Sequence, residues 1–205
     1  MPIGKPHGEM STMVATAVAS GPQTDTRQRL IDAAIALFIR HSFAGTSLQM
    51  IADELGITKA AIYHHFRTRE QLLTAVLEPI FAAITTIVED AEKHRGAHAR
   101  AERMLTGYAR VAVDNPMLVA VLANDPGVHS VVKSNRTWTD MIARQLALFA
   151  DLDPGPEGLM RARFTYAGLA GSADPRRGGD RDWLQRQLVE SGRRTLGLRT
   201  PRRTH

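Results

Sequence analysis

The chain has 205 residues, no cysteine and a formal net charge of +5 at pH 7. That length allows a buried core in one large or two small domains, and the lack of cysteine excludes disulfides, thiolate metal sites and a cysteine nucleophile. The apolar stretch at residues 13–19 is too short for a signal peptide, and no run approaches the roughly 18 apolar residues of a membrane-spanning helix, so we expect a soluble, cytoplasmic protein with no membrane partner.

The N-terminal part of the chain begins with a segment that lacks helical periodicity. Residues 1–23 mix Gly, Pro, Ser, Thr and Ala, and this composition predicts a disordered tail. Over residues 24–41, apolar residues recur three and four positions apart, which predicts an amphipathic helix capped by its first polar residues. Phe43 and Gly45 then form the turn before the next helix.

Two short helices are predicted next, over residues 47–55 and 59–66. Gly56 stands where a left-handed C-terminal cap is expected, and Thr58 where an N-cap is expected. Two short helices joined by a turn that contains glycine are typical of a helix-turn-helix, whose second helix can enter the DNA major groove. On that second helix we expect Ile62 and Phe66 to face inward, and the outward residues to be Thr58, Lys59, Ala60, Tyr63 and His64.

Helices are also predicted for the rest of the chain, where strand-type alternation is almost absent. Thr68 begins a fourth helix, with Gln71 at the spacing of a capping box, and a further helix begins after Pro79. Turn and helix-stop signals separate the later helices, which we expect over residues 80–94, 98–114, 117–123, 128–150, 157–172 and 180–197. Residues 200–205 read as a frayed basic tail. The predicted fold class is all-α.

The charge pattern gives only local support for a nucleic-acid partner. Most of the basic excess lies in residues 176–205, so the net charge by itself is weak evidence. A basic face is nevertheless expected around Lys59, Arg67 and Arg69, since no acid interrupts that run. His64 and His65 in the same run point about 100 degrees apart on a helix and have no evident third ligand, so we expect no metal and no cofactor.

The segment from residue 25 to residue 77 resembles the TetR (tetracycline-repressor-like) family of regulators. The matching motifs are the Leu37-Phe38 pair, the Phe43-x-Gly45-Thr46-Ser47 turn, Ile51-Ala52, Leu55-Gly56-Ile57-Thr58-Lys59, the run from Ile62 to Phe66, and Arg69-Glu70-x-Leu72-Leu73. The chain departs from the family's pattern at three positions, with Ala60 in place of glycine, His65 in place of a second aromatic residue and Arg69 in place of lysine. The last change is expected to alter at most one phosphate contact.

The resemblance implies a homodimeric, sequence-specific transcriptional regulator, a repressor that a small-molecule effector releases from a palindromic double-stranded DNA operator. It also implies a three-helix helix-turn-helix DNA-binding domain over residues 24–70 and a C-terminal helical effector-binding and dimerisation domain over residues 71–199. The DNA contacts, carried over by position, fall on the groove-facing residues Thr58, Lys59 and Ala60, the groove-edge residues Tyr63 and His64, and the phosphate-binding residues Ser47 and Arg69.

Two sets of residues in the C-terminal part are candidate sites. Aromatic and methionine side chains line adaptable apolar cavities, and on that ground the candidate effector-pocket residues are Phe81, Met104, Tyr108, Met117, Leu122, Trp138 and Met141. A stripe of small residues and an apolar helix face form the candidate dimer interface, with the residues Phe164, Ala167, Gly168, Gly171, Trp183, Leu184 and Leu188. For both sets, the alternative interpretation is an ordinary intramolecular core.

Two other classes of protein remain as alternatives. An enzyme would draw on Asp125, His129 and Asp174, but no phosphate-binding glycine loop, nucleophile elbow or metal-spaced cluster accompanies them, so we expect no catalytic residues. A helical binding or scaffold protein without DNA-binding activity is the second alternative.

For the regulator, the sequence specifies neither the effector, nor the operator, nor the number of dimers per operator, nor the sign of regulation.

Overall fold

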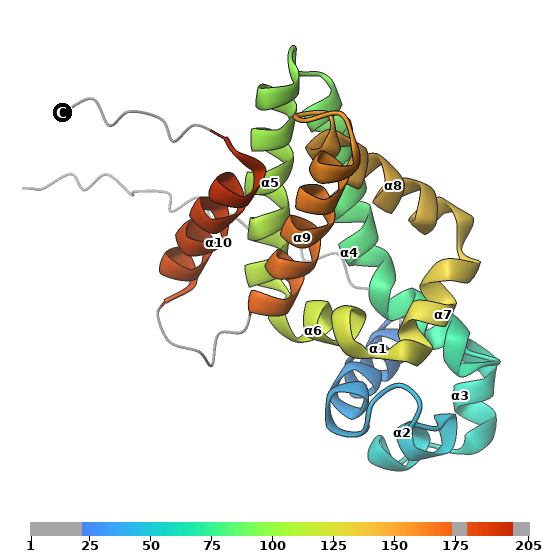
Figure 1. The fold of residues 1–205 in the computed structure, drawn as a ribbon. Coiled ribbons are helices and arrows are strands. Elements are labelled where there is room, and N and C mark those ends of the chain that lie inside the picture. The colour runs from blue at the N-terminus through green and yellow to red at the C-terminus, as the bar shows by residue number, and fades with distance from the viewer. Residues whose placement is uncertain (1–21, 174–179, 199–205) are drawn as a thin grey trace, which may run out of the picture.

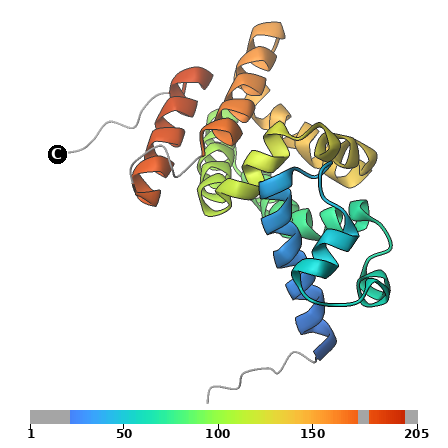
Figure 2. The same cartoon turned by 90° about the horizontal axis from the view of Figure 1, so that it is seen from below.

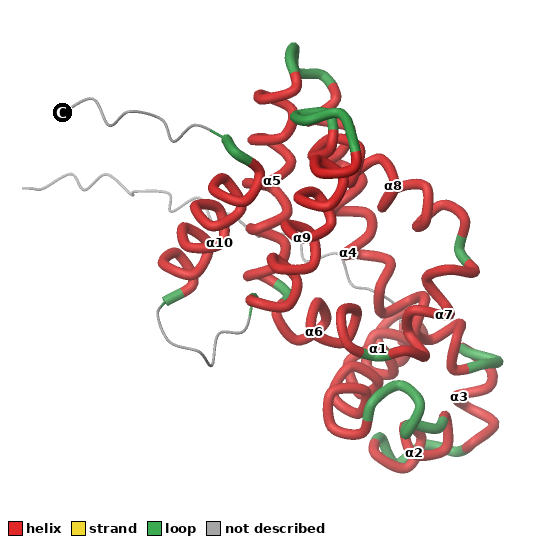
Figure 3. Tube along the Cα trace, viewed as in Figure 1, coloured by secondary structure: helices red, strands yellow, loops and turns green. Residues whose placement is uncertain are grey.

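The computed structural model describes residues 22–173 and 180–198, and these residues form ten α-helices and no strand (Figure 1; Figure 3). The predicted all-α fold is confirmed. The predicted turn at residues 174–179 and the predicted C-terminal tail lie outside the described residues, and so does the predicted N-terminal tail apart from its last two residues. Those two, Pro22 and Gln23, begin the first helix.

The helices follow one another with short connections. Their bounds are α1 (Pro22–His41), α2 (Leu48–Glu54), α3 (Lys59–His65), α4 (Arg69–Glu92), α5 (Ala97–Asp114), α6 (Pro116–Asn124), α7 (Pro126–Ser134), α8 (Arg136–Ala150), α9 (Pro156–Ser172) and α10 (Arg181–Leu196).

The first three helices gather at one end of the molecule, and α4 extends from them into the larger helical part (Figure 1). In that larger part α4 packs on α5, α8 packs on α9, and α10 packs on both α5 and α9. The view from below shows α1–α3 and α10 on opposite sides (Figure 2). One cluster of buried apolar residues runs from Leu30 in α1 to Leu198 beyond α10, so both parts share a continuous core.

The long helix α4 differs from its prediction because it continues through Pro79. A proline inside a helix lacks the N–H donor and crowds the carbonyl four residues earlier, which is why a break was expected. Buried residues on both sides, Val76 and Leu77 before it and Ile80 and Phe81 after it, hold the two segments against the core while Pro79 is exposed. Burial of this apolar face outweighs the lost hydrogen bond.

The length and apolar composition of α4 raise the question of whether this helix could span a membrane. Within residues 22–173 and 180–198, α4 is the only helix whose length and apolar character would let it cross a membrane. Its apolar residues are used inside the protein, since α4 packs on α1, α5, α7 and α8. We therefore interpret α4 as the central helix of the core.

The prediction of a single helix over residues 128–150 is wrong, because the structure has two helices there. Asn135 separates α7 from α8, and its side chain accepts a hydrogen bond from the backbone N–H of Trp138 at 3.2 Å. An asparagine in this role satisfies amides at a helix start. The apolar periodicity runs across the break, and for that reason the pattern alone did not reveal it.

The domain boundary predicted between residues 70 and 71 falls inside the first turn of α4. Contacts of α1 with α4 and with α6 join the two proposed domains on either side of it. The division into two domains therefore stays a proposal about function.

Candidate functional site

Each short helix of the helix-turn-helix begins at a side-chain cap. The hydroxyl of Ser47 accepts from the backbone N–H of Met50 at 3.1 Å, and that of Thr58 accepts from Ala61 N–H at 3.2 Å. Such caps satisfy backbone donors that have no partner within the helix. Gly56 lies between the two helices with φ of 64°, a left-handed conformation that favours glycine. The two side-chain caps and the left-handed glycine explain why two short helices form here.

The helix α3 has one buried side and one exposed side, as predicted. Ile62 is fully buried and Phe66 is 4% exposed, so both anchor the helix to the small core. Tyr63 is 43% exposed, and the Nζ of Lys59 lies 5.7 Å from the centroid of its ring. The outer surface thus presents an ammonium group and a phenol beside each other. The other predicted contact residues on this surface, Thr58, Ala60 and His64, are exposed as well.

Arg69 has a structural role that the sequence did not reveal. Its Nη1 donates to the carbonyl oxygens of Phe43, Ala44 and Thr46 at 3.2, 3.1 and 2.9 Å. Its guanidinium carbon also lies 5.0 Å from the centroid of the Phe43 ring. The planar guanidinium therefore fastens the start of α4 to the turn between α1 and α2. Its partial exposure leaves room for the predicted phosphate contact.

Replacing Arg69 by lysine is expected to lower the free energy of unfolding by about 1 to 2 kcal/mol, because an ammonium cannot reproduce the planar fork. Urea denaturation measures this loss, with the exposed neighbour substitution Arg67→Lys as the matched control. Unchanged stability together with weaker DNA binding would mean that Arg69 acts on phosphate alone.

Asp125 makes a second, unpredicted link to the same turn. Its Oδ2 accepts from the backbone N–H of Phe43 at 2.7 Å, while its Oδ1 accepts from Gly127 and Val128 N–H at 2.8 and 3.3 Å. The carboxylate thereby caps α7 and ties it to the helix-turn-helix. Asp before Pro126 does signal a helix start, with proline at the first position. No sequence signal pairs it with Phe43.

These contacts also bear on the enzyme alternative. Both carboxylate oxygens of Asp125 are occupied by backbone donors, and Asp174 lies outside the described residues. The Nε2 of His129 lies 2.8 Å from the carbonyl oxygen of Leu122, which can only accept, so Nε2 carries the proton. Asp125 and His129 are thus both engaged with backbone groups. Within the part of the chain that the structure describes, no three His, Asp or Glu side chains gather as a metal site.

A cavity of about 560 Å³ lies among α4, α5, α6, α7, α8 and α9. Ligand pockets commonly span about 300 to 1,000 Å³, so a small molecule fits. Most of its lining is apolar, and its polar lining residues are Tyr108, His129, Lys133, Thr139 and Tyr166.

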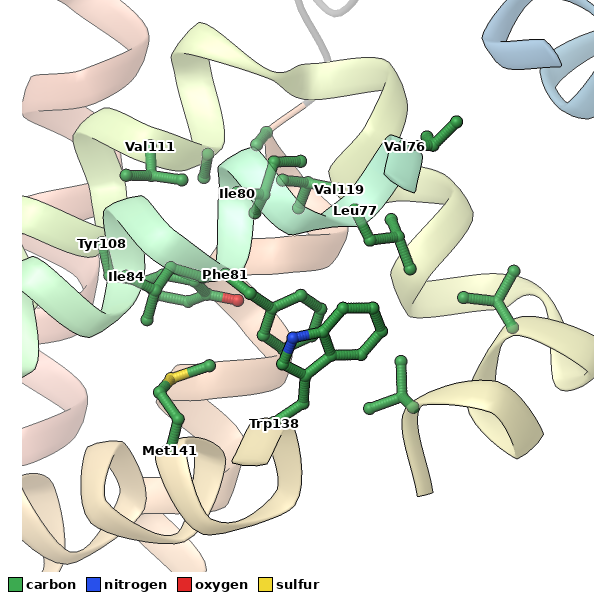
Figure 4. Close-up of a cluster of buried hydrophobic side chains, with 14 of the residues drawn as sticks. Val76, Leu77, Ile80, Phe81, Ile84, Tyr108, Val111, Val119, Trp138 and Met141 are labelled. Atoms are coloured by element: carbon green, nitrogen blue, oxygen red, sulfur yellow. The ribbon is translucent and has the colours of Figure 1, made fainter. Parts of the chain in front are cut away.

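Three of the predicted pocket residues line this cavity, namely Phe81, Tyr108 and Leu122. Trp138 is not a lining residue, but it stacks on Phe81 with ring centroids 4.3 Å apart (Figure 4). Met141 is buried nearby, and Met104 is fully buried in the core. Neither methionine is a lining residue, and the side chain of Met117 lies outside the described part. Helical spacing indicated that these residues face inward but not which of them border an open space.

Two tyrosines form the α5–α9 side of the cavity. The rings of Tyr108 and Tyr166 stack with centroids 5.4 Å apart and an interplanar angle of 2°. Burial raises the pKa of Tyr108 well above its usual value, and the neighbouring Tyr166 phenol raises it further. Burial also raises the pKa of Tyr166. Both phenols are therefore neutral hydrogen-bonding groups at physiological pH.

The predicted dimer residues lie on the faces of α9 and α10. Phe164, Gly168, Trp183, Leu184 and Leu188 together line one surface groove of about 390 Å³. Phe164 is 73% exposed and Met160, one turn before it, is 69% exposed, whereas Leu184 and Leu188 are buried. The other two predicted residues, Ala167 and Gly171, are exposed and border the cavity, and Ala167 also lines a second surface groove with Met160 and Phe164.

This face has the character of an unpartnered interface. A Cβ at Gly168 or Gly171 would have open space around it, so neither glycine is needed for packing inside the chain. Large exposed apolar side chains such as Phe164 and Met160 on one helix are typical of protein–protein contacts. This face of α9 and α10 is therefore a candidate surface for association with another protein.

The helix-turn-helix segment matches a known family. Residues 30–76 match the family of bacterial regulatory proteins, tetR family. The chain is 43% identical over 54 residues to an uncharacterized HTH-type transcriptional regulator, YerO, of Bacillus subtilis, and 42% identical over 53 residues to the HTH-type transcriptional regulator SrpR of Pseudomonas putida. Each match covers 26% of this chain, and 19% and 25% of the respective relative. These two matches thus span about a quarter of this chain and at most a quarter of either relative.

Similarity of fold extends over nearly the whole chain. A crystal structure of a tetR-family regulatory protein from Rhodococcus RHA1 matches with a TM-score of 0.66 and 18% identity, over 88% of this chain and 100% of that one. The ketosteroid transcriptional regulator KstR2 of Mycobacterium tuberculosis matches with a TM-score of 0.67 and 18% identity, over 90% of this chain and 97% of that one. At this identity the likeness concerns the fold alone.

Proposed function

We propose that this chain, whose residues 30–76 match the tetR family of bacterial regulatory proteins, is a dimeric, sequence-specific transcriptional regulator of that family. In this proposal it acts as a cytoplasmic repressor that a small-molecule effector releases from a palindromic operator. The observation that carries the proposal is the exposed surface of α3, where Lys59 and Tyr63 stand outward while Ile62 and Phe66 hold the helix to the core.

The proposed DNA contacts follow from this surface. Lys59 can donate to guanine O6 or N7 in the major groove, and small Ala60 allows the helix to approach the base edges. Tyr63 and His64 would reach the groove edge and the phosphates, while Ser47 and Arg69 would contact phosphates near helix starts. Two subunits related by a two-fold axis would place two α3 helices in successive major grooves, roughly 34 Å apart.

The proposed effector site is the cavity among α4–α9, within the effector-binding and dimerisation domain of residues 71–199. Val132 and Lys133 of α7 line the cavity, and the first residues of α7 share the Asp125 carboxylate with the turn at Phe43. A ligand that favours one position of α7 would therefore bias the helix-turn-helix of residues 24–70. Coupling of this kind is worth about 1 to 3 kcal/mol.

The test is retention of DNA from the genome of origin, followed by binding to the recovered duplex at several salt concentrations. Lys59→Ala is expected to weaken binding about tenfold or more, because it removes a donor to bases or phosphates. Tyr63→Phe, which removes only a hydroxyl, is expected to cost about 1 kcal/mol. Lys93→Ala, at an exposed lysine at the end of α4, is the matched control and should leave binding unchanged.

The outcomes separate the competing functions. A steep loss of affinity with salt indicates phosphate contacts that release counterions. Full affinity of both α3 variants would contradict the residue assignments. A protein that stays dimeric but retains no duplex would instead be a helical binding or scaffold protein.

A further inference from the structure

The cavity has an unusual balance of charge. Lys133 is the one charged side chain among its lining residues, and no aspartate or glutamate lines it. The nearest acids in sequence point to other partners, since Asp125 binds Phe43 N–H and Asp140 lies 3.9 Å from the Nε of Arg136. Within the described residues no ion pair involves Lys133, whose side chain is exposed at the end of α7. A ligand therefore meets one uncompensated positive charge.

Two of the other polar side chains of the lining already use their donors within the protein. The Nε2–H of His129 is used by the Leu122 carbonyl, and the hydroxyl of Thr139 donates to the Arg136 carbonyl at 2.9 Å. Burial keeps the phenols of Tyr108 and Tyr166 protonated, so neither adds a charge to the lining. Among the described residues the Lys133 ammonium has no such acceptor, so it remains available to a ligand that supplies acceptor oxygens.

A cation would find no acidic partner in this cavity, since no aspartate or glutamate lines it. A cation could gain from aromatic faces, but one face of Phe81 is covered by Trp138, and Tyr108 and Tyr166 cover each other. The charges at helix ends do not reverse this balance, because the C-terminus of α7 and the N-terminus of α8 meet at Asn135 and oppose each other. Lys133 is the deciding charge.

From this geometry we propose that the cavity binds a small apolar molecule that carries one carboxylate or comparable anionic group. The anionic group lies at Lys133, and the apolar body lies against Phe81, Ile84 and Ile142 on the α4 and α8 walls. This assignment of ligand class rests on the proposed function only in that it takes the cavity to be the effector site.

The test uses three probes with the same ten-carbon chain, sodium decanoate, decan-1-ol and decylammonium chloride, titrated calorimetrically into the whole protein at pH 7.5. Decanoate is expected to bind about threefold more tightly than decanol and about tenfold more tightly than decylammonium, as one partly exposed charge would produce. In Lys133→Met the three affinities should fall within about threefold of one another, with the decanol affinity unchanged. Lys93→Met is the matched control and should keep the wild-type order.

Decylammonium binding as tightly as decanoate would overturn the proposal. So would an anion preference that survives in Lys133→Met, or failure of all three probes to bind. DNA binding without any probe is measured on the same preparations. DNA retention with no anion preference would refute the ligand class alone, whereas an anion preference without DNA retention would refute the proposed regulator and leave the cavity assignment standing.

Discussion

Phe164→Glu is expected to turn the proposed dimer into a monomer and to lower affinity for a full palindromic operator by at least about a hundredfold. The side chain of Phe164 is 73% exposed in the single chain, on the groove that Trp183 and Gly168 also line. An aromatic residue at the centre of an interface commonly contributes about 2 kcal/mol or more, and a carboxylate there would be buried without a partner. Each half of the operator is then bound by a separate monomer and no longer by one dimer, which lowers the affinity.

The mass in solution, measured by light scattering, and operator binding by gel shift report the two effects separately. Thr86→Glu introduces the same charge on an exposed position of α4, beside a different groove, and serves as the control. It should leave mass and affinity as in the wild type. A Phe164→Glu protein that remains dimeric would mean that the subunits associate through another face.

Asp125→Ala is expected to have the largest effect on the connection between the cavity helices and the helix-turn-helix. The substitution removes three acceptor contacts and leaves the N–H of Phe43 without its partner in a buried place. Leaving such groups unsatisfied costs about 1 to 3 kcal/mol. The free energy of unfolding should fall by that amount, and hydrogen exchange at the Phe43 amide should accelerate at least about tenfold because the turn opens locally.

A second cap in the same region provides the control for this experiment. Asn135→Ala removes the acceptor for Trp138 N–H but touches nothing in the helix-turn-helix. It should cost about 1 kcal/mol and leave exchange at Phe43 unchanged. If Asp125→Ala lowers stability without affecting the Phe43 amide, Asp125 is a helix cap and not a link between the two parts.

Much of the architecture was predictable because local rules agree with one another in this sequence. Gly56 and Thr58 define the ends of α2 and α3, and the spacing of Ile62 and Phe66 identifies the buried side of α3. These signals act within a few residues of each other. They were sufficient to predict the helix-turn-helix and the exposure of Lys59 and Tyr63.

The errors in the helix assignments arose where two signals compete. At Pro79 a strong breaker meets a continuous apolar face, and tertiary packing keeps α4 whole. At Asn135 the apolar face also continues, but a capping side chain ends one helix and starts the next. Periodicity reports burial and does not distinguish these two results.

The contacts that join distant segments could not be predicted from one sequence. Asp125 and Phe43 are 82 positions apart, and the three carbonyls bound by Arg69 lie 23 to 26 positions before it. Similarly, an inward-facing residue becomes a cavity wall only if its neighbours leave space, which separates Phe81 and Tyr108 from Met104. Such information resides in the packing of several helices at once.

The helix α9 supplies residues to two surfaces within two turns. Phe164 and Gly168 border the groove toward the proposed partner subunit, and Ala167 and Gly171 border the cavity. A substitution that reshapes one surface shifts the backbone that carries the other. Under the proposed assignments, changes in the range of molecules that the cavity accepts are therefore tied to changes in how firmly two copies associate, and variants selected for a new ligand should be screened for altered self-association.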